Sequence, residues 1–274
     1  MKISNGKNVT RVICFASISI LGSAFSVPLP SVEEIVERTE IAAYYEGDDG
    51  RAQVEMIVTD GQGRERVRRL TILRRDQQEK SDKVQLGEQK YYVHIEFPSD
   101  LRHTVLTVWK HGEKDDDRWL YLPALDLVRR IAAGDKRTAF LGSDFFYEDI
   151  SGRSTELDYH ELLEVSDNYF VIKNTPKHPD NVEFSNYKMW IHKPTFIPVK
   201  VEFYDKQGDP YRVYEALAVE TVQGYPTVIK SRMKDLRDKS ETVLVFDRVQ
   251  YNMGIPETIF EEQYLRNPPQ KYLH

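Results

Sequence analysis

The order of apolar and polar positions predicts one helix near the start of the chain. From Ser31 to about Glu46, apolar residues recur at three- and four-residue intervals, which is the spacing of one face of a helix. Ser31 and Glu34 match the capping box that begins many helices, and the GDDG stretch at 47–50 is expected to end this one. The segment is therefore predicted to be an amphipathic helix.

After residue 50 the apolar pattern changes to a period of two. Residues 52–58 and 91–97 alternate between apolar and polar side chains, as half-buried strands do. Further strands are predicted at residues 66–75, 103–110, 118–123, 127–132, 161–165, 169–174, 186–192, 197–205, 211–220, 227–236 and 241–251. Their connections are short and rich in turn residues, which favours antiparallel hairpins. Residues 256–265 are predicted to form a short closing helix that starts at Pro256.

This many consecutive antiparallel strands predict a sheet that curls, because a flat open sheet of that width is rare. No period of 20–50 residues repeats, and no linker rich in Ser, Gly or Pro divides the chain. The predicted fold class is mainly β with α (α+β), a single curled antiparallel sheet in one domain at 27–274. The helix near each end is expected to cover the concave face of the sheet.

The N-terminus has the features of a secretory signal peptide. Three basic residues precede a short apolar run, VICFASISILGSAFS at 12–26. Ala24 and Ser26 fit the small-x-small rule, so cleavage is expected near Ser26, with export to the periplasm. The run is shorter than the roughly 20 apolar residues that span a bilayer. Cys14, the single cysteine, lies inside this segment and is expected to be removed with it rather than lipidated.

Cleavage would leave an acidic chain without cysteine. Lys and Arg would fall from 38 to 35 while 44 Asp and Glu remain, so the formal net charge would change from −6 to −9. This charge disfavours binding to the phosphates of nucleic acid and simple adsorption to anionic lipid. Because no disulfide can form, the hydrophobic core has to stabilise the exported protein.

Sequence patterns of catalytic or metal sites are few. There is no G-x-S-x-G, P-loop, H-E-x-x-H or CxxC. The acidic stretch EKDDDR at 113–118 lacks the glycine and terminal glutamate of an EF-hand, so a hairpin loop is favoured. Ser143, Asp144 and His160 are the sole support for a serine hydrolase, and we do not expect an enzyme. No cofactor or metal is expected, since the histidines are scattered: His94, His103, His111, His160, His178, His192 and His274.

Several predicted strands are apolar on both faces. Trp119 and Tyr121 share one face of their strand, while Leu120 and Leu122 lie on the other, and residues 243–249 behave similarly. Such a surplus suits a sheet whose inner wall encloses a cavity. It equally suits a filled core with a covered outer face, and the periodicity leaves both interpretations open.

The stretch RWLYLPALDLVRRIAAGDKRTAFLGSDFFYEDI at 118–150 is long and specific. Its parts are W-x-Y-L-P-x-L at 119–125, R-R-I at 129–131, Lys136, and F-x-G-S-D-F-x-Y-E-D at 140–149. Together with a signal peptide, a first helix, many strands and a closing helix, it resembles the LolA-like family of outer-membrane lipoprotein-sorting proteins. The chain is longer than the lipoprotein chaperone itself, and its signature is similar to that of a sister branch.

The resemblance implies an unclosed antiparallel β-barrel, with helices as a lid over an apolar concave side. It also implies a carrier that takes lipoprotein acyl chains, lipid or another hydrophobic molecule across the periplasm. The implied partners are an inner-membrane transporter or exporter and an outer-membrane acceptor, and no nucleic acid. Cargo identity does not follow from the resemblance, because the chain departs from the chaperone.

The resemblance also suggests roles for FLGSDFFYED, which we expect at the mouth or lid of the cavity. Gly142 would permit the turn. The aromatic residues expected to contact cargo are Trp109, Trp119, Tyr121, Phe140, Phe145, Phe146, Tyr147 and Trp190. The residues expected to anchor the loop through ion pairs are Arg129, Arg130, Arg137, Asp144, Glu148 and Asp149. An alternative stays open, in which these pairs hold the fold and touch no cargo.

Two other roles fit the same resemblance. One is a periplasmic sensor of lipids or mislocalised envelope proteins, which would normally need a further domain or a membrane partner. The other is an accessory protein that handles a hydrophobic client of an RND-type exporter.

Overall fold

The computed structural model describes residues 29–77, 88–111 and 114–274. The predicted signal peptide at 1–26 and Cys14 lie outside the described residues. Helix α1 spans Val32–Tyr44, close to the predicted segment. The Ser31 side chain accepts a hydrogen bond from the Glu34 backbone N–H at 3.1 Å, and so caps the helix. Glu34 itself lies 3.5 Å from Arg38 in an exposed pair.

Thirteen strands form one antiparallel sheet in the described residues. They are β1 (Asp49–Thr59), β2 (Glu65–Asp76), β3 (Gln89–Phe97), β4 (Val105–Lys110), β5 (Asp117–Leu122), β6 (Leu127–Ile131), β7 (Asp158–Val165), β8 (Tyr169–Pro176), β9 (Asn186–His192), β10 (Pro198–Tyr204), β11 (Pro210–Val222), β12 (Tyr225–Asp235) and β13 (Ser240–Tyr251). Acidic residues at 115–117 lead into β5, as expected of a hairpin connection.

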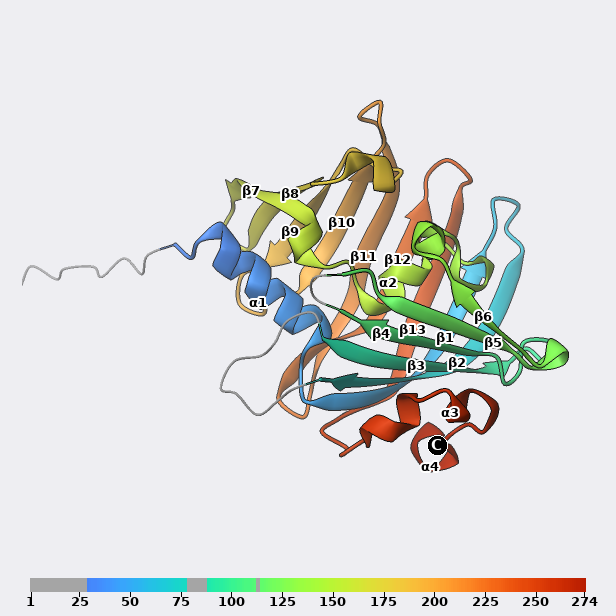
Figure 1. The fold of residues 1–274 in the computed structure, drawn as a ribbon. Coiled ribbons are helices and arrows are strands. Elements are labelled where there is room, and N and C mark those ends of the chain that lie inside the picture. The colour runs from blue at the N-terminus through green and yellow to red at the C-terminus, as the bar shows by residue number, and fades with distance from the viewer. Residues whose placement is uncertain (1–28, 78–87, 112–113) are drawn as a thin grey trace, which may run out of the picture. The chain divides into compact units, whose positions relative to one another are not determined.

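The sheet consists of two meanders joined at one seam. The strand order is β6-β5-β4-β3-β2-β1-β13-β12-β11-β10-β9-β8-β7, so β1 and β13 pair at the centre. β6 and β7 are the two free edges, and the barrel is not closed. Figure 1 shows β3–β6 running across the view while β10–β13 rise steeply, which is the predicted curl.

Elements outside the sheet cover both of its faces. Helix α1 packs on one face through Ile35 and Val36, against β8 and β9. The same face receives the segment between β6 and β7, which contains α2 (Tyr147–Ser151) and buries Phe140 and Phe145. We call residues 138–151 the inner segment, and the sheet face that it covers the inner face.

The C-terminal residues lie on the opposite, outer face. They form a 3-10 turn at Glu257–Phe260, then α3 (Gln263–Arg266) and α4 (Gln270–Leu273), seen at the bottom of Figure 1. Ile259 and Phe260 pack against the outer-face side chains Tyr92 and Tyr121. The single closing helix predicted at 256–265 is therefore wrong, and this region does not cover the concave side. Short helices suffice here because each buries only one or two side chains in the sheet.

Candidate functional site

A cavity of about 390 Å³ lies between α1 and the inner face of the sheet. Its walls are mainly apolar side chains, among them Val36, Ile72, Tyr91, Met233, Leu244 and Phe246. On the helix side the lining residues include Thr39, Ala42 and Ala43, whose side chains are small. The helix therefore roofs the cavity without filling it.

The C-terminal end of α1 is fixed by one arginine of β2. Arg74 donates hydrogen bonds to the backbone carbonyls of Tyr44, Glu46 and Gly47, two of them at 2.7 and 2.6 Å. The Tyr44 carbonyl is one of those that a helix leaves without partners at its end, and Glu46 and Gly47 belong to the turn that follows. One turn before the end of the helix, Glu40 lies 3.5 Å from the buried ammonium group of Lys110. The roof is thus tied to the sheet by polar contacts as well as by packing.

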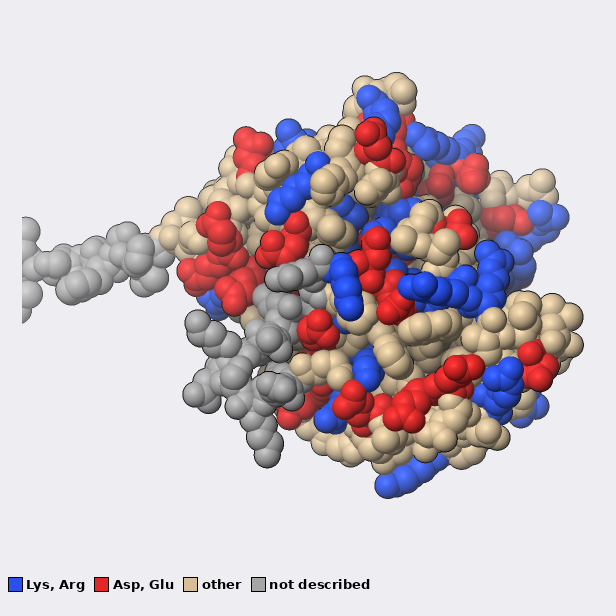
Figure 2. Space-filling model, viewed as in Figure 1, with Lys and Arg blue, Asp and Glu red and all other residues tan. Residues whose placement is uncertain are grey.

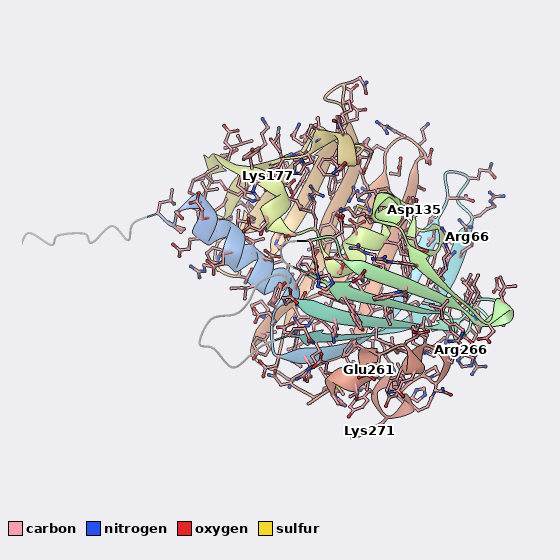
Figure 3. All side chains as sticks on the ribbon, in the orientation of Figure 1. Arg66, Asp135, Lys177, Glu261, Arg266 and Lys271 are labelled. Atoms are coloured by element: carbon pink, nitrogen blue, oxygen red, sulfur yellow. The ribbon has the colours of Figure 1, made fainter. Side chains whose placement is uncertain are left out.

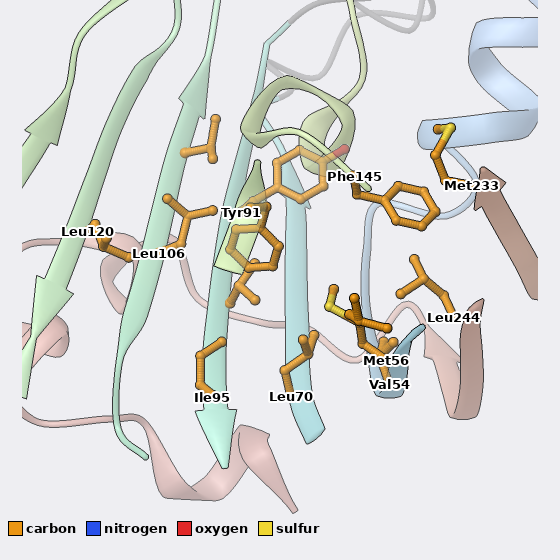
Figure 4. Close-up of a cluster of buried hydrophobic side chains, with 14 of the residues drawn as sticks. Val54, Met56, Leu70, Tyr91, Ile95, Leu106, Leu120, Phe145, Met233 and Leu244 are labelled. Carbon is orange, nitrogen blue, oxygen red and sulfur yellow. The ribbon is translucent and has the colours of Figure 1, made fainter. Parts of the chain in front are cut away.

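The inner segment folds back on itself before it enters α2. The Phe140 backbone N–H donates to the Phe145 carbonyl at 2.8 Å, and the Ser143 hydroxyl donates to the Phe140 carbonyl at 2.7 Å. Leu141 and Gly142 both have positive φ, at 50° and 65°, and Gly142 accepts this conformation without strain. The turn directs Phe140 and Phe145 toward the sheet. Figure 4 shows Phe145 between Tyr91 on one side and Met233 and Leu244 on the other.

Ion pairs between charged side chains fix the position of the inner segment. Arg137 has a side chain that is only 7% exposed, and it lies 3.1 Å from Glu148 and 2.5 Å from Glu183. Burial alone would lower the pKa of Arg137. The hydrogen bond to Glu183 and the nearby carboxylates outweigh burial and raise it. Arg153 lies 3.5 Å from Glu148 and 2.9 Å from Asp158. The result is a compact network of alternating charge at one end of the cavity.

Phe146 lies between two guanidinium groups instead of facing the cavity. The Arg212 guanidinium carbon is 4.0 Å from the centre of its ring, and that of Arg137 is 4.9 Å away. Arg212 also pairs with Asp149 and donates to the Asp144 carbonyl at 2.6 Å. Cation–π contacts of this kind stabilise a buried ring and position the charged groups around it.

Of the eight aromatic residues expected to contact cargo, Phe145 lines the cavity. Phe140 is fully buried in the core, and Tyr147 packs against it with ring centres 5.6 Å apart. Four others lie on the outer face: Trp109, Trp119, Tyr121 and Trp190. The indole of Trp109 donates to the Phe260 carbonyl, and Tyr121 packs in the outer cluster. These four side chains do not line the cavity, and a period of two could not show this, because it does not reveal which face is the inner one. Their contact with cargo stays a prediction.

The structure contains some of the expected ion pairs and not others. Glu148 and Asp149 contact Arg137, as described above. Arg129 instead lies 3.7 Å from Asp135, and Arg130 pairs with Asp117, so neither reaches the inner segment. They belong to edge strand β6 and are exposed to solvent. The Asp144 carboxylate accepts hydrogen bonds from Ser240 and Thr242 of β13 rather than from an arginine side chain.

Ser143 and His160 make separate contacts in the structure. The Ser143 hydroxyl contacts backbone carbonyls, and the His160 ring contacts Asn174 and the Thr155 carbonyl. The two side chains are not paired with each other. In residues 29–77, 88–111 and 114–274, no three His, Cys, Asp or Glu side chains gather as metal ligands would. No helix in the same ranges has the length and apolar character needed to cross a bilayer.

Comparison with known proteins identifies the family. A family model described as "Uncharacterized protein" matches residues 87–267, about two thirds of the chain. A crystal structure of a DUF1329 family protein from Desulfovibrio piger superposes with a TM-score of 0.75 at 24% identity, over 85% of this chain and 97% of that one. The chain belongs to the family that this family model describes, and its fold is that of LolA-like proteins. No functionally curated protein matches the sequence.

Two further solved structures share the LolA-like fold. An outer membrane lipoprotein-sorting protein domain from Vibrio parahaemolyticus is 25% identical, with a TM-score of 0.76, over 85% of this chain and 97% of that one. A LolA superfamily protein from Nitrosomonas europaea is 19% identical, with a TM-score of 0.67, over 86% of this chain and all of that one. The predicted family and the unclosed barrel are confirmed.

The cavity of this LolA-like protein also contains residues that the sequence did not single out. Arg212 connects the inner segment to β11, and Ala42, Ala52 and Met233 line the cavity. Ala52 could have been found, because it continues the apolar alternation of residues 52–58. Arg212 could not, since its partners lie more than 60 residues away in the sequence.

Proposed function

We propose that this protein is a periplasmic carrier that binds lipoprotein acyl chains, lipid or another hydrophobic molecule in the cavity under α1. The observation that carries the proposal is the cavity itself, about 390 Å³ with mainly apolar walls. Its volume falls in the range of about 300–1,000 Å³ that is typical of small-molecule sites. No catalytic step is part of the proposal.

The physical basis is the solvation of an acyl chain. Each methylene that leaves a membrane for water costs about 0.8 kcal/mol, so a soluble carrier must offer a similar apolar environment. The walls formed by Val36, Met233, Leu244 and Phe246 offer it. Phe145 lies between this cavity and the filled part of the core, and we assign it the role of the movable wall that adapts to cargo.

The carrier would act as one exported domain at 27–274, after cleavage of the predicted signal peptide. It would receive cargo from an inner-membrane transporter or exporter and deliver it to an outer-membrane acceptor. Support comes from the solved relative named as an outer membrane lipoprotein-sorting protein domain. In this role Arg137, Glu148 and Asp149 position the inner segment, and Phe145 contacts the cargo.

The first test is native mass spectrometry of the protein purified gently from the periplasm of a Gram-negative host. We expect a bound lipid or acylated peptide near one per protein, which solvent extraction would identify. A protein without bound lipid that also fails to take up a dansyl-labelled fatty acid would contradict the carrier function.

A matched pair of variants places binding in the cavity. Ala52→Phe adds a ring to the cavity wall and should weaken binding of the labelled fatty acid by about tenfold or more, a change of at least about 1.4 kcal/mol. Ala133→Phe makes the same change at an exposed position outside the cavity and should leave binding unchanged. Equal affinities for both variants would show that the cargo binds elsewhere.

A further inference from the structure

Arg68 is a buried arginine for which the described part of the chain provides no counter-ion. It belongs to β2 and is 7% exposed. Its Nε and Nη1 atoms are buried and have no hydrogen-bond partner among the described residues. Within residues 29–77, 88–111 and 114–274, no ion pair within 4.0 Å involves Arg68, whereas Arg74 on the same face of β2 lies 3.6 Å from Asp76.

The surroundings of Arg68 are largely apolar. Met56 lies opposite it on β1, and Leu70 follows on the same face of β2. The Leu141–Gly142 turn of the inner segment lies close by, since Nη2 is 3.9 Å from the position that a Cβ atom on Gly142 would take. The guanidinium group therefore lies under this turn, among hydrophobic side chains of the core. Arg68 is not part of the wall of the cavity under α1.

Such an arrangement is unfavourable for the protein alone. An ionised group that is removed from water without a partner costs several kcal/mol. Burial lowers the pKa of Arg68, as does nearby Arg66, while the carboxylate of Asp100 partly opposes the change. An arginine nevertheless stays protonated in proteins. By contrast, the largely buried side chains of Arg137 and Arg212 each contact a carboxylate.

A second cation lies beside Arg68. Arg66 is two residues earlier on β2, so its side chain points to the same face, and it is exposed. Figure 3 labels Arg66 at the hairpin end of β2. Arg66 likewise has no ion pair among the described residues. Figure 2 shows Lys and Arg together with Asp and Glu over the visible surface.

We propose that Arg68, with Arg66 beside it, forms an anion-binding site under the Leu141–Gly142 turn that accepts one carboxylate or phosphate group. The planar fork of a guanidinium group matches both oxyanions through paired hydrogen bonds. The anion would supply the acceptors that Nε and Nη1 lack. This site is separate from the apolar cavity and does not depend on the carrier function. The anion can be a free ion or the head group of an amphiphile.

The test compares three proteins by thermal unfolding: wild type, Arg68→Met and Arg69→Met. Arg69 is the matched control, because it follows Arg68 on the same strand but faces outward, over the ring of Phe97. Each protein is measured in sodium phosphate and in chloride at equal ionic strength. It is then measured with dodecanoate and with dodecanol, which share a chain and differ in charge.

We expect phosphate, dodecanoate or both to raise the Tm of wild type and Arg69→Met more than their uncharged or chloride controls do. Arg68→Met should have a higher Tm without anion, by about 2–4 °C for each kcal/mol recovered, and should lose the response to anions. Its affinity for the anion should fall about tenfold or more. A response to phosphate supports a free-ion source, and a response to dodecanoate alone supports an amphiphile.

Other outcomes would overturn the site. A lower Tm for Arg68→Met with an undiminished response to anions would make Arg68 a structural residue. If Arg68→Met does not fold, Arg68→Lys replaces it, because lysine keeps the charge but lacks the planar guanidinium group. An anion response of Arg68→Lys equal to that of wild type would contradict recognition through paired guanidinium hydrogen bonds. If phosphate does not raise the Tm of wild type and dodecanoate and dodecanol act equally on all proteins, the anion site is refuted and the carrier function still stands. A response to phosphate without binding of either amphiphile would support the anion site and contradict the carrier function.

Discussion

The two meanders of the sheet differ in what occupies their inner face. Over β1–β6, the inner segment inserts Phe140 and Phe145 among the strand side chains and produces a dense core. Over β7–β13 and the adjoining parts of β1–β3, α1 spans the inner face and leaves about 390 Å³ open. Both inner faces are apolar, so the sheet alone does not decide which half is filled.

The difference arises from the covering element. The irregular inner segment folds back on itself, so that the rings of Phe140 and Phe145 both pack against the curved sheet. A straight helix cannot follow that curvature, and the side chains that α1 presents over the cavity include Thr39, Ala42 and Ala43, which are small. A protein can therefore build a filled core and a binding cavity on one continuous sheet by changing what lies above it. The predictions below test this contrast.

The largest effect is expected from the network that positions the inner segment. Arg137→Met would leave the buried Glu148 without one of its main partners and would also remove the pair with the more exposed Glu183. Loss of one member of a buried ion pair typically costs about 3–5 kcal/mol, which urea unfolding would measure. Arg130→Met removes an arginine whose side chain is 68% exposed and should cost less than about 1 kcal/mol. Similar losses for both variants would contradict a special role of the network.

A second prediction separates the filled half from the hollow half. Phe140 is fully buried but does not line the cavity. Phe140→Ala should lower the free energy of unfolding by about 3 kcal/mol, the lower end for a buried ring, because Tyr147 can relax toward the space. Affinity for a labelled fatty acid should stay within about twofold of wild type, a difference of only about 0.4 kcal/mol. A large loss of affinity would mean that the two halves are coupled.

The third prediction concerns pH and the end of α1. Asp76 lies 3.6 Å from Arg74, and its Oδ2 has no hydrogen-bond partner among the described residues. Burial raises the pKa of Asp76 to about 6. Because the folded-state pKa exceeds the unfolded value of about 3.9, this group favours folding below pH ~4 and loses that contribution as the pH rises through ~6.

Asp76→Asn keeps the neutral form at every pH. Its stability relative to wild type should therefore increase between pH 4 and pH 7, on the order of 2 kcal/mol. Thermal unfolding of both proteins across this range would measure the change. A constant difference between them would show that Asp76 ionises normally in the folded protein.

The smallest effect is expected at the start of the same helix. Ser31→Ala removes the N-cap and should cost about 1 kcal/mol. Hydrogen exchange should become faster in the first turn of α1 and stay unchanged in the inner segment. Ser31→Asp, which can accept the same hydrogen bond, should restore slow exchange. Faster exchange in both segments would indicate that the two covering elements unfold together.

Local patterns predicted the elements of this fold well. The capped helix at 31–46 and the alternating strands rest on periodicities that neighbouring residues set. The same periodicity correctly separated Trp119 and Tyr121 from Leu120 and Leu122, but it could not say which pair faces inward. That choice depends on the distant residues Ile259 and Phe260, which cover the outer face.

The contacts of the candidate site were harder to predict from the sequence, because they too depend on residues that are distant along the chain. Arg129 and Arg130 are near the inner segment along the chain, yet strand pairing directs them to Asp135 and Asp117. Arg212 contacts Asp149 because the sheet curls, which no local pattern encodes. Family resemblance identified the correct segment, while the partners of each side chain required the three-dimensional arrangement.

The central seam of the sheet has a consequence for how the chain folds. β1 pairs with β13, which joins Gly50 to Tyr251, about 200 residues later. Contacts this distant in sequence form slowly, because a long loop must close before they do. During synthesis the β1–β6 meander would carry an open edge at β1 until residues 240–251 arrive, and open edges promote aggregation. A chain truncated before Ser240 should therefore aggregate more readily than the complete chain, in which β13 covers this edge.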